Sequence, residues 1–360
     1  MFSGRILHAK ETGLLVVVLL LAGGLAVHSE LNPIERDGRR VNTFLQSENL
    51  DLLFKETSYL AVMAVGATMV IAAGGIDLSI GSIYCLAAVL GALFLEYFGP
   101  AGRGAGASPA WTVPVGIAVC LGAGALCGLA NGVILVALRV HPFIVTLGTM
   151  AIYRGIAFVI TEGQTVRNFP TELTHGLIGR AVGPLYPVPA LLMAVVLIAA
   201  AVFLKHTVWG RYAYAIGGNE LASRYSGVRV ERIKVLVFTL AGLTGGIAAV
   251  ILLGVYGAAN SGTGTSYELQ VIAAAVVGGA SLSGGRGTAL GAFLGALIIT
   301  LIGKAIILLN INQAYSRIII GVVVICAVVV DRFSLGLVHR RMVRAAGPVG
   351  QPASEYEPRP

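Results

Sequence analysis

The sequence predicts an all-α polytopic membrane protein, and its composition and its apolar runs are the observations behind this prediction. Hydrophobic residues make up 56% of the 360 positions, charged residues make up 12%, and the mean hydropathy is +0.86. A soluble domain normally carries about 25% charged residues. Apolar runs of about 20 residues, the length that a helix needs to cross a bilayer, recur along nearly the whole chain. A soluble protein with unusually large cores fits these runs poorly.

The apolar runs predict about ten transmembrane helices with short connections. They lie near residues 12–28, 57–74, 80–98, 112–138, 143–161, 188–204, 233–255, 267–281, 287–308 and 312–330. The count depends on how the short run at 267–281 and the glycine-containing region 74–82 fold, because both are candidate breaks inside the membrane. Arg5 and Lys10 precede the first run, as in a signal peptide, but "GLAVHSE" is a poor cleavage site, so an uncleaved span is favoured.

Basic residues give the predicted orientation. The net charge of +8 would suggest nucleic acid in a soluble protein. Here the basic residues cluster in short loops beside apolar runs, which is typical of membrane orientation, and no nucleic-acid partner is expected. The loop 205–234 and the tail after Asp331 are the most basic, so we expect both of them, and both chain ends, on the cytoplasmic side. The cluster of Arg36, Arg39 and Arg40 in the first outer loop is an exception.

The domain organisation is expected to be simple. Residues 1–332 would form one transmembrane domain, and residues 333–360 a disordered cytoplasmic tail, because "AAGPVGQPASEYEPRP" is rich in proline, glycine and polar residues. The four cysteines lie in apolar runs without CxxC spacing and the six histidines are scattered, so we expect no disulfide framework, no metal site and no catalytic residues. No G-x-x-x-x-G-K-[ST] loop is present, so any nucleotide would bind another chain.

An internal repeat surrounds the region 74–82. Residues 74–82 read GGIDLSIGS and residues 278–286 read GGASLSGGR, and both fit G-G-x-[D/S]-L-S-x-G. Chance similarity between glycine-rich segments is the alternative, but the segments that follow also agree in order. Glycine-interrupted helices in corresponding positions of two halves are typical of transporters and mark the substrate or gate region. Ten spans make the two copies parallel, and a change of one span would invert them.

Asp77 is the charged residue of the first copy. A carboxylate at the bilayer centre costs about 2.5–3.5 kcal/mol on insertion scales. Its counterpart is Ser281, so the second copy needs no charge, and both residue types can cap a helix N-terminus. We therefore favour capping of the following helix by Asp77, and by Ser281 in the second copy. Contact with substrate or gate, and proton coupling, are the alternatives.

Three further polar residues lie in apolar runs. Asn131 is expected to hydrogen-bond across helices among small residues. Arg154 is expected near a span end, where it would snorkel. Lys304 lies deeper, and its partner could be a backbone carbonyl, a facing carboxylate or a lipid.

The basic loop contains a short predicted helix at 220–226. Asn219 is a favoured N-cap, Glu220 suits the positive end of the helix dipole, and Gly227 suits the position after the C-cap. So short a helix is marginal alone, so we expect it to dock onto a cytoplasmic partner. An amphipathic helix lying on lipid headgroups is the alternative.

Four blocks resemble the ribose-type permeases of bacterial ABC importers. They are "MAVGATMVIAAGGIDLSIGS" (63–82), "ANGVILVALRVHPFIVTLGTMAIYRGIAFVIT" (130–161), "YAIGGNELASRYSGVRVERIKVLVF" (214–238) and "SYELQVIAAAVVGGASLSGGRGT" (266–288). They occur in the family's order, and the resemblance covers residues 57–332. The segment 29–56 and the C-terminal tail are longer than is typical of the family.

The resemblance implies an ABC importer permease architecture with several partners. They would be a second permease copy or a related permease, a cytoplasmic ABC ATPase that binds ATP and Mg, a periplasmic or lipid-anchored sugar-binding protein, and the lipid of the bacterial inner membrane. The permease itself would bind no cofactor and would move a monosaccharide, such as a ribose-like pentose or a hexose, by alternating access. A nucleoside or a signalling sugar would suit the same permease type.

The resemblance also assigns residues. ATPase coupling, within a cytoplasmic segment at 211–234, would involve Asn219, Glu220, Ser226 and Gly227. Family signatures and the repeat give the pathway or gate candidates Gly75, Asp77, Ser79, Gly81, Asn131, Glu268, Gly278, Gly279 and Ser281, and Gly285 matches the last signature.

Two other classes compete with this interpretation. An ion-coupled secondary transporter would use Asp77, Glu268 and Lys304 as a charge relay, but it does not explain a capped cytoplasmic helix. A structural or sensory membrane subunit does not explain the repeat with its broken helices.

Overall fold

The computed structural model describes residues 2–36, 39–100, 102, 107–167, 169–180, 187–316, 318–323, 325, 326 and 329. The predicted tail at 333–360 and its basic residues lie outside this part of the chain. Within it the protein is an all-α polytopic membrane protein, as predicted.

Eight helices of the described part are long and apolar enough to cross a membrane. They are α1 (Phe2–Leu31), α2 (Ser47–Ala72), α3 (Ile80–Phe98), α4 (Pro109–Leu138), α5 (Pro142–Thr161), α6 (Pro187–His206), α9 (Val230–Tyr256) and α11 (Ala289–Leu308). The two other predicted spans, 267–281 and 312–330, coincide with the shorter apolar helices α10 (Tyr267–Val277) and Gln313–Val323. A count of ten crossings therefore stays a prediction.

Short elements connect the long helices. A two-stranded antiparallel hairpin, β1 (Ile34–Arg36) and β2 (Arg39–Val41), joins α1 to α2. The π-helical turn η1 (Glu172–Leu177) lies between α5 and α6, and the 3-10 turn η2 (Gln313–Tyr315) follows α11. α7 (Val208–Gly218) and α8 (Glu220–Tyr225) join α6 to α9.

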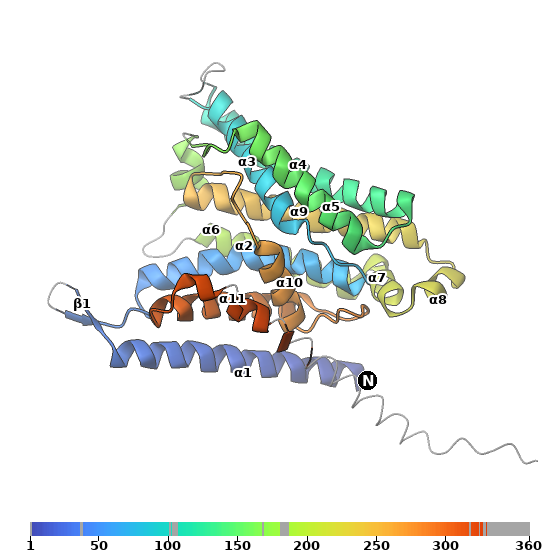
Figure 1. Ribbon diagram of the computed structural model, residues 1–360, viewed down its shortest axis with the longest axis horizontal. Coiled ribbons are helices and arrows are strands. Elements are labelled where there is room, and N and C mark those ends of the chain that lie inside the picture. Colours follow the sequence, from blue (N-terminus) through green and yellow to red (C-terminus); the bar gives the residue numbers. More distant parts are fainter. Residues whose placement is uncertain are drawn as a thin grey trace, which may run out of the picture.

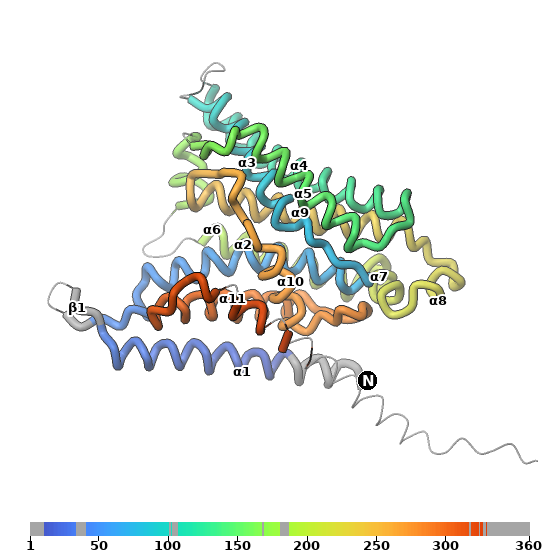
Figure 2. Tube along the Cα trace, in the orientation of Figure 1, coloured from blue at the N-terminus to red at the C-terminus, as the bar shows by residue number. Residues whose placement is uncertain are grey.

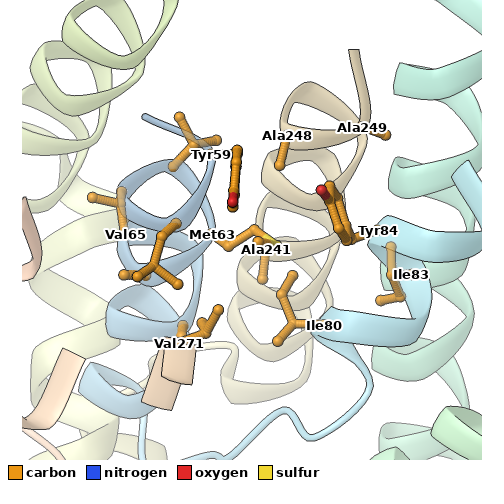
Figure 3. Packing of buried hydrophobic residues seen from close by; sticks show 14 of the residues in the cluster. Tyr59, Met63, Val65, Ile80, Ile83, Tyr84, Ala241, Ala248, Ala249 and Val271 are labelled. Carbon is orange, nitrogen blue, oxygen red and sulfur yellow. The ribbon is translucent and has the colours of Figure 1, made fainter. Parts of the chain in front are cut away.

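The helices form two groups that meet at α2 and α9. One group contains α3, α4 and α5, and the other contains α1, α10 and α11, as Figure 1 shows. α2 is the most enclosed of the eight long helices and α1 the least. Figure 3 shows the shared core, where Tyr59 and Met63 of α2, Ile80 of α3 and Ala241 of α9 point toward one another.

One end of the molecule gathers the basic loop and the start of the chain. The tube in Figure 2 follows α1 from the end where α7 and α8 lie to the end where the hairpin lies. Two contacts fix the arrangement: Thr288 Oγ1 donates to Glu11 Oε1 at 2.9 Å, and the Tyr214 hydroxyl donates to the Gly287 carbonyl oxygen at 2.5 Å. The structure therefore places the loop 205–234 at the same end as the N-terminal part of α1, as the charge pattern predicts.

α10 runs parallel to α2. The Tyr267 ring at the start of α10 stacks on the Tyr59 ring in the middle of α2, with ring centroids 6.0 Å apart. The Gly285 backbone amide, beyond the end of α10, donates to the carbonyl oxygen of Ala72, the last residue of α2, at 3.0 Å. The opening helices of the two repeat copies therefore point in the same direction.

Glycines set the distance between α4 and α9. A Cβ atom added at Gly242 of α9 would lie 2.2 Å from the Gly124 carbonyl oxygen and 2.7 Å from Gly128 Cα, both in α4. Small residues at such contacts are typical of membrane helices, because in lipid close backbone packing drives association. The obstructing atoms are backbone, so neither helix can give way by a side-chain rotation.

We expect Gly242→Ala to destabilise the protein by about 1–3 kcal/mol through overpacking. Gly148→Ala in α5 is the matched control, because a Cβ atom there meets nothing within 4 Å. The control should leave stability unchanged or raise it by about 0.5–1 kcal/mol. Thermal unfolding of the purified protein in detergent measures both, and equal stability of the two variants would contradict the packing argument.

Candidate functional site

The first helix break lies between α2 and α3. α2 ends at Ala72, Gly74 takes φ +80°, and the Gly75 amide donates to the Val70 carbonyl oxygen at 2.9 Å. This is a left-handed helix end of the Schellman type, which satisfies carbonyl groups that the helix leaves free. The segment that follows has no helical structure, and α3 begins at Ile80.

Asp77 prepares the start of α3 but is not its N-cap. The N-cap is Ser79, and its own side chain makes no capping hydrogen bond. Asp77 Oδ1 instead accepts from the Ser79 amide at 2.8 Å and from the Ser79 hydroxyl at 2.6 Å. The N-cap position predicted for Asp77 is therefore taken by Ser79. Asp77 closes a turn two residues before the N-cap, with a local hydrogen bond of the kind that Asp favours in turns. Asp77 Oδ2 is buried and has no hydrogen-bond partner.

A buried polar chain ties this break to α4 and α5. Asn131 Nδ2 in α4 donates to Ser79 Oγ at 2.7 Å. The Tyr153 hydroxyl in α5 lies 3.1 Å from Asn131 Oδ1, to which it can donate, and Thr146 Oγ1 lies 3.2 Å from the Ile76 carbonyl oxygen. Asn131 does bond between helices, as expected. Sequence reasoning missed Tyr153 and Thr146, which look like ordinary residues of an amphipathic span.

The second break differs from the first. α10 ends at Val277 with Gly278 as C-cap, and Gly279 takes φ +95°. In this second break the glycine with positive φ is therefore the second of its pair. In the first break it is Gly74, the first of its pair. The structural correspondence between the two breaks is thus shifted by one residue relative to the match in sequence. Gly278 also lies against α11, where an added Cβ atom would stand 2.2 Å from the Gly291 carbonyl oxygen.

Ser281 does not begin a helix, contrary to the prediction. Its carbonyl oxygen accepts from the Gly284 amide at 2.8 Å in a turn. α11 begins only at Ala289, where Thr288 is the N-cap and its hydroxyl oxygen accepts from the Gly291 amide at 2.9 Å. Gly285 lies between these two points and bonds to the end of α2 as described above. The sequence match of Asp77 with Ser281 therefore pairs residues with different local structures.

The start of α3 meets the start of α10. A Cβ atom at Gly81 would lie 2.7 Å from Glu268 Oε2 and 3.0 Å from the Gly264 carbonyl oxygen. A carboxylate near the first turn of α3 interacts favourably with the helix dipole. Glu268 Oε2 is otherwise buried without a hydrogen-bond partner. The candidates Gly81 and Glu268, which are far apart in sequence, are thus brought together at the centre of the molecule.

Arg154 holds the loop that leads into α10. Its Nη1 donates to the carbonyl oxygens of Ser261, at 3.0 Å, and Thr263, and its Nη2 donates to that of Gly264 at 3.2 Å. The expectation that Arg154 snorkels at a span end is therefore wrong. Loop carbonyls inside a membrane protein need internal donors because no water is available, and the guanidinium supplies several at fixed angles.

Lys304 pairs with a carboxylate. Its Nζ lies 3.4 Å from Glu56 Oε2, and the lysine side chain is only 2% exposed. Of the three partners left open by the sequence, the structure thus selects a carboxylate. Asp77 bonds to Ser79, and Glu268 lies against Gly81, so the described contacts do not join these residues to Lys304 in one relay.

The short helix predicted at 220–226 is confirmed as α8, which spans Glu220–Tyr225. Asn219 is its N-cap, and Asn219 Oδ1 accepts from the Ala222 amide at 2.9 Å. Ser226 is the C-cap, and Gly227 takes φ +83°. The Leu221 and Tyr225 side chains are 62% and 82% exposed, so one surface of this short helix is apolar and unpacked.

Ion pairs fasten α8 to α9. Glu220 Oε2 accepts from Lys234 Nζ at 2.7 Å, and Arg224 pairs with Glu231. The hydrogen bond from Arg224 to Glu231 raises the pKa of Arg224 above its ordinary value. The residues predicted to couple with a partner therefore lie on or beside a helix that ion pairs connect to α9.

Comparisons with known proteins identify the family of this chain. Residues 49–328 match the family described as the permease component of the branched-chain amino acid transport system. The match covers most of the chain, and the chain belongs to this family of transport permeases. It is accordingly a multi-pass membrane protein and a transporter subunit.

Curated relatives cover nearly the full length. The chain is 38% identical to the ribose import permease protein RbsC of Escherichia coli over 337 residues, 91% of this chain and 97% of the relative. It is 36% identical to RbsC of Bacillus subtilis over 89% of this chain and 91% of the relative. It is 32% identical to the autoinducer 2 import system permease protein LsrC of an Enterobacter species over 91% and 88%. No solved structure matches significantly. The resemblance to ribose-type permeases is confirmed.

We expect Asp77→Asn to keep the fold and transport close to wild type, because the amide oxygen can still accept from Ser79. Asp77→Leu leaves the amide and hydroxyl of Ser79 without this acceptor, which should cost about 1–3 kcal/mol. Thermal unfolding in detergent and uptake into vesicles measure the two effects. Loss of transport in a stably folded Asp77→Asn variant would instead show that the negative charge itself is required.

Proposed function

We propose that this chain is the permease subunit of an ATP-driven ABC importer that moves a monosaccharide into the cytoplasm. The single observation that supports this most strongly is its similarity to ribose import permeases over nearly their whole length. A ribose-like pentose is the favoured substrate, and a hexose or the signalling molecule of the autoinducer 2 systems is the alternative.

Energy is proposed to come from a separate ATPase. ABC systems place ATP and Mg on a partner subunit, and this sequence has no phosphate-binding loop. A sugar-binding protein outside the cell would deliver the substrate, and a second permease copy or a related permease would complete the pathway. We place the chain in the bacterial inner membrane with both termini in the cytoplasm, because the basic loop 205–234 lies at the same end as the N-terminal part of α1, and ten crossings would return the C-terminus to that side.

The exposed face of α8 is the proposed docking surface for the ATPase. Leu221 and Tyr225 supply its apolar contacts, and Asn219, Ser226 and Gly227 fix where the helix begins and ends. The ion pairs of Glu220 and Arg224 hold α8 to the start of α9. A displacement of α8 by the ATPase would therefore displace α9.

α9 can carry this displacement to the pathway. It packs closely against α4 through backbone contacts at Gly242, which leave no free space between the two helices at this point. α4 in turn holds Ser79 through Asn131. A continuous series of contacts thus joins the docking surface to the first helix break, where alternating access would open and close the pathway.

Reconstitution tests the proposed function. Proteoliposomes that contain this chain, its ATPase and its binding protein should accumulate a monosaccharide only with ATP, and collapse of the proton gradient should leave uptake unchanged. Uptake that follows the proton gradient without ATP would identify an ion-coupled transporter instead, in which the unpartnered oxygens of Asp77 and Glu268 would be the first residues to examine.

A charge swap tests the role of α8 as a lever. Glu220→Arg should uncouple ATP hydrolysis from uptake, because it places a positive charge beside Lys234 and Arg224. The double variant Glu220→Arg with Lys234→Glu restores the pair with α9 and should recover a large part of the coupling. Uptake and ATP hydrolysis are measured in the same vesicles. Coupling that survives the single variant unchanged would remove Glu220 from the mechanism.

A further inference from the structure

A cavity of about 430 Å³ lies between α2, α10, α11 and η2, away from the Asp77 break. Its polar lining consists chiefly of Glu56, Tyr59, Tyr267, Gln270, Thr300 and Gln313. None of these residues was predicted from the sequence as part of the pathway. Leu60, Ile299 and Ile306 add apolar walls. The lining therefore mixes polar and apolar groups in similar measure, and polar groups that converge on a pocket are what orient a small molecule.

The polar groups suit a ligand that both donates and accepts hydrogen bonds. The Gln270 amide can do both, whereas the Thr300 hydroxyl already donates to the Ala296 carbonyl oxygen at 2.9 Å and, like the Glu56 carboxylate, is left to accept. Sugar hydroxyls also do both, so each can find a complementary partner here. Tyr59 and Tyr267 stack nearly parallel, with 13° between their ring planes, and so form a fixed part of the cavity wall.

The charges in the cavity are already balanced. The Glu56 carboxylate pairs with Lys304, which is almost fully buried. An ionic ligand would meet no unpaired opposite charge from this pair, whereas a neutral polyhydroxylated ligand can bond to the remaining lone pairs of the carboxylate. The pair also holds α2 and α11 together, so it keeps two walls of the cavity in place.

The cavity lies toward the end of the molecule opposite α7 and α8. α11 begins beside Glu11, at the α7–α8 end, and Gly303 and Ile306 of the cavity wall belong to its last turns. In the proposed orientation this is the outer side of the membrane. The lining residues nearest the α7–α8 end are Gln270 of α10 and Ile299 and Thr300 of α11. Beside the start of α10, the first turn of α3 packs closely against Glu268 at Gly81.

We propose that this cavity is the outward-side binding site for the monosaccharide within the permease. The proposal rests on the proposed function, because it places the same substrate at a defined point of its path. Binding there should be weak, since a transport site must release its ligand as readily as it accepts it. The hydroxyls of the sugar would bond to Glu56, Gln270 and Thr300, and the sugar would advance when the close contact between α3 and α10 at Gly81 loosens.

Gly303 provides the decisive variant. It lines the cavity, and a Cβ atom added there meets no protein atom within 4 Å. Gly303→Trp should therefore fill the cavity without a clash at its Cβ position. In the reconstituted transporter we expect ribose uptake to fall by at least about tenfold, while Gly303→Ala stays within about twofold of wild type. ATP hydrolysis stimulated by the binding protein should persist in both, because α8 is untouched.

Gly148→Trp is the matched control, since Gly148 also has open space around its Cβ position but lies in α5, away from the cavity. Wild-type uptake in Gly303→Trp, or an equal loss in both tryptophan variants, would overturn the proposal. If the wild-type transporter shows no ATP-driven monosaccharide uptake, the proposed function fails first and the cavity proposal falls with it. Uptake that is normal in the wild type and in every Gly303 variant overturns the cavity proposal alone.

Gln270→Leu gives an independent measurement that does not depend on filling the cavity. Its readout is the ratio of uptake rates for ribose and for a ribose analogue that lacks one hydroxyl, with the same binding protein in all vesicles. A site that bonds to a hydroxyl discriminates against an analogue without it. For the analogue that lacks the hydroxyl bonded by Gln270, the ratio of ribose uptake to analogue uptake should therefore fall toward one in Gln270→Leu. Ratios identical to wild type for all analogues would contradict a contact between Gln270 and the sugar.

Discussion

The hydrogen bonds from Ser79 to the Asp77 carboxylate are the constraint on which the transmembrane core depends. Residues 73–79 run without helical structure through the interior of the molecule, and from Ile76 to the Ser79 amide the backbone lacks the partners that a helix supplies. A polar backbone group without a partner at membrane depth costs several kcal/mol. The Asp77 carboxylate accepts from the Ser79 amide, Thr146 donates to the Ile76 carbonyl oxygen, and Asn131 holds the Ser79 hydroxyl in place. They also decide where α3 starts, and therefore which residues of α3 face α10.

The same demand explains why charged residues occur in the apolar interior. Arg154 serves the carbonyls of the loop before α10, as Asp77 serves the Ser79 amide before α3. The first helix break is thus stabilised by an acceptor and the loop before α10 by a donor, according to which backbone groups are left free. Intramembrane charges are commonly interpreted as ion-coupling groups. In this chain the described contacts give Arg154 and one oxygen of Asp77 a structural task.

Sequence reasoning succeeded where a pattern is local. Apolar runs located the eight long helices, and Asn219 with Gly227 located both ends of α8, because caps and spans are encoded by neighbouring residues. It failed where partners are distant. The partners of Arg154 and Lys304, and the pairing of Gly81 with Glu268, depend on how helices from different parts of the chain pack. The repeat was visible in sequence, but its one-residue shift depends on φ angles, which glycine pairs do not specify.

The attachment of α2 at two levels has a mechanical consequence. Just before its midpoint Glu56 bonds to Lys304 of α11, and at its inner end Ala72 accepts from Gly285 of the loop before α11. Tyr267 of α10 also stacks on Tyr59 of α2, so we expect α2, α10 and α11 to move together as one frame. Relative motion would then occur between this frame and the group α3–α4–α5. The loop 257–266 would connect the two moving parts, because Arg154 anchors it to α5 and it is continuous with α10.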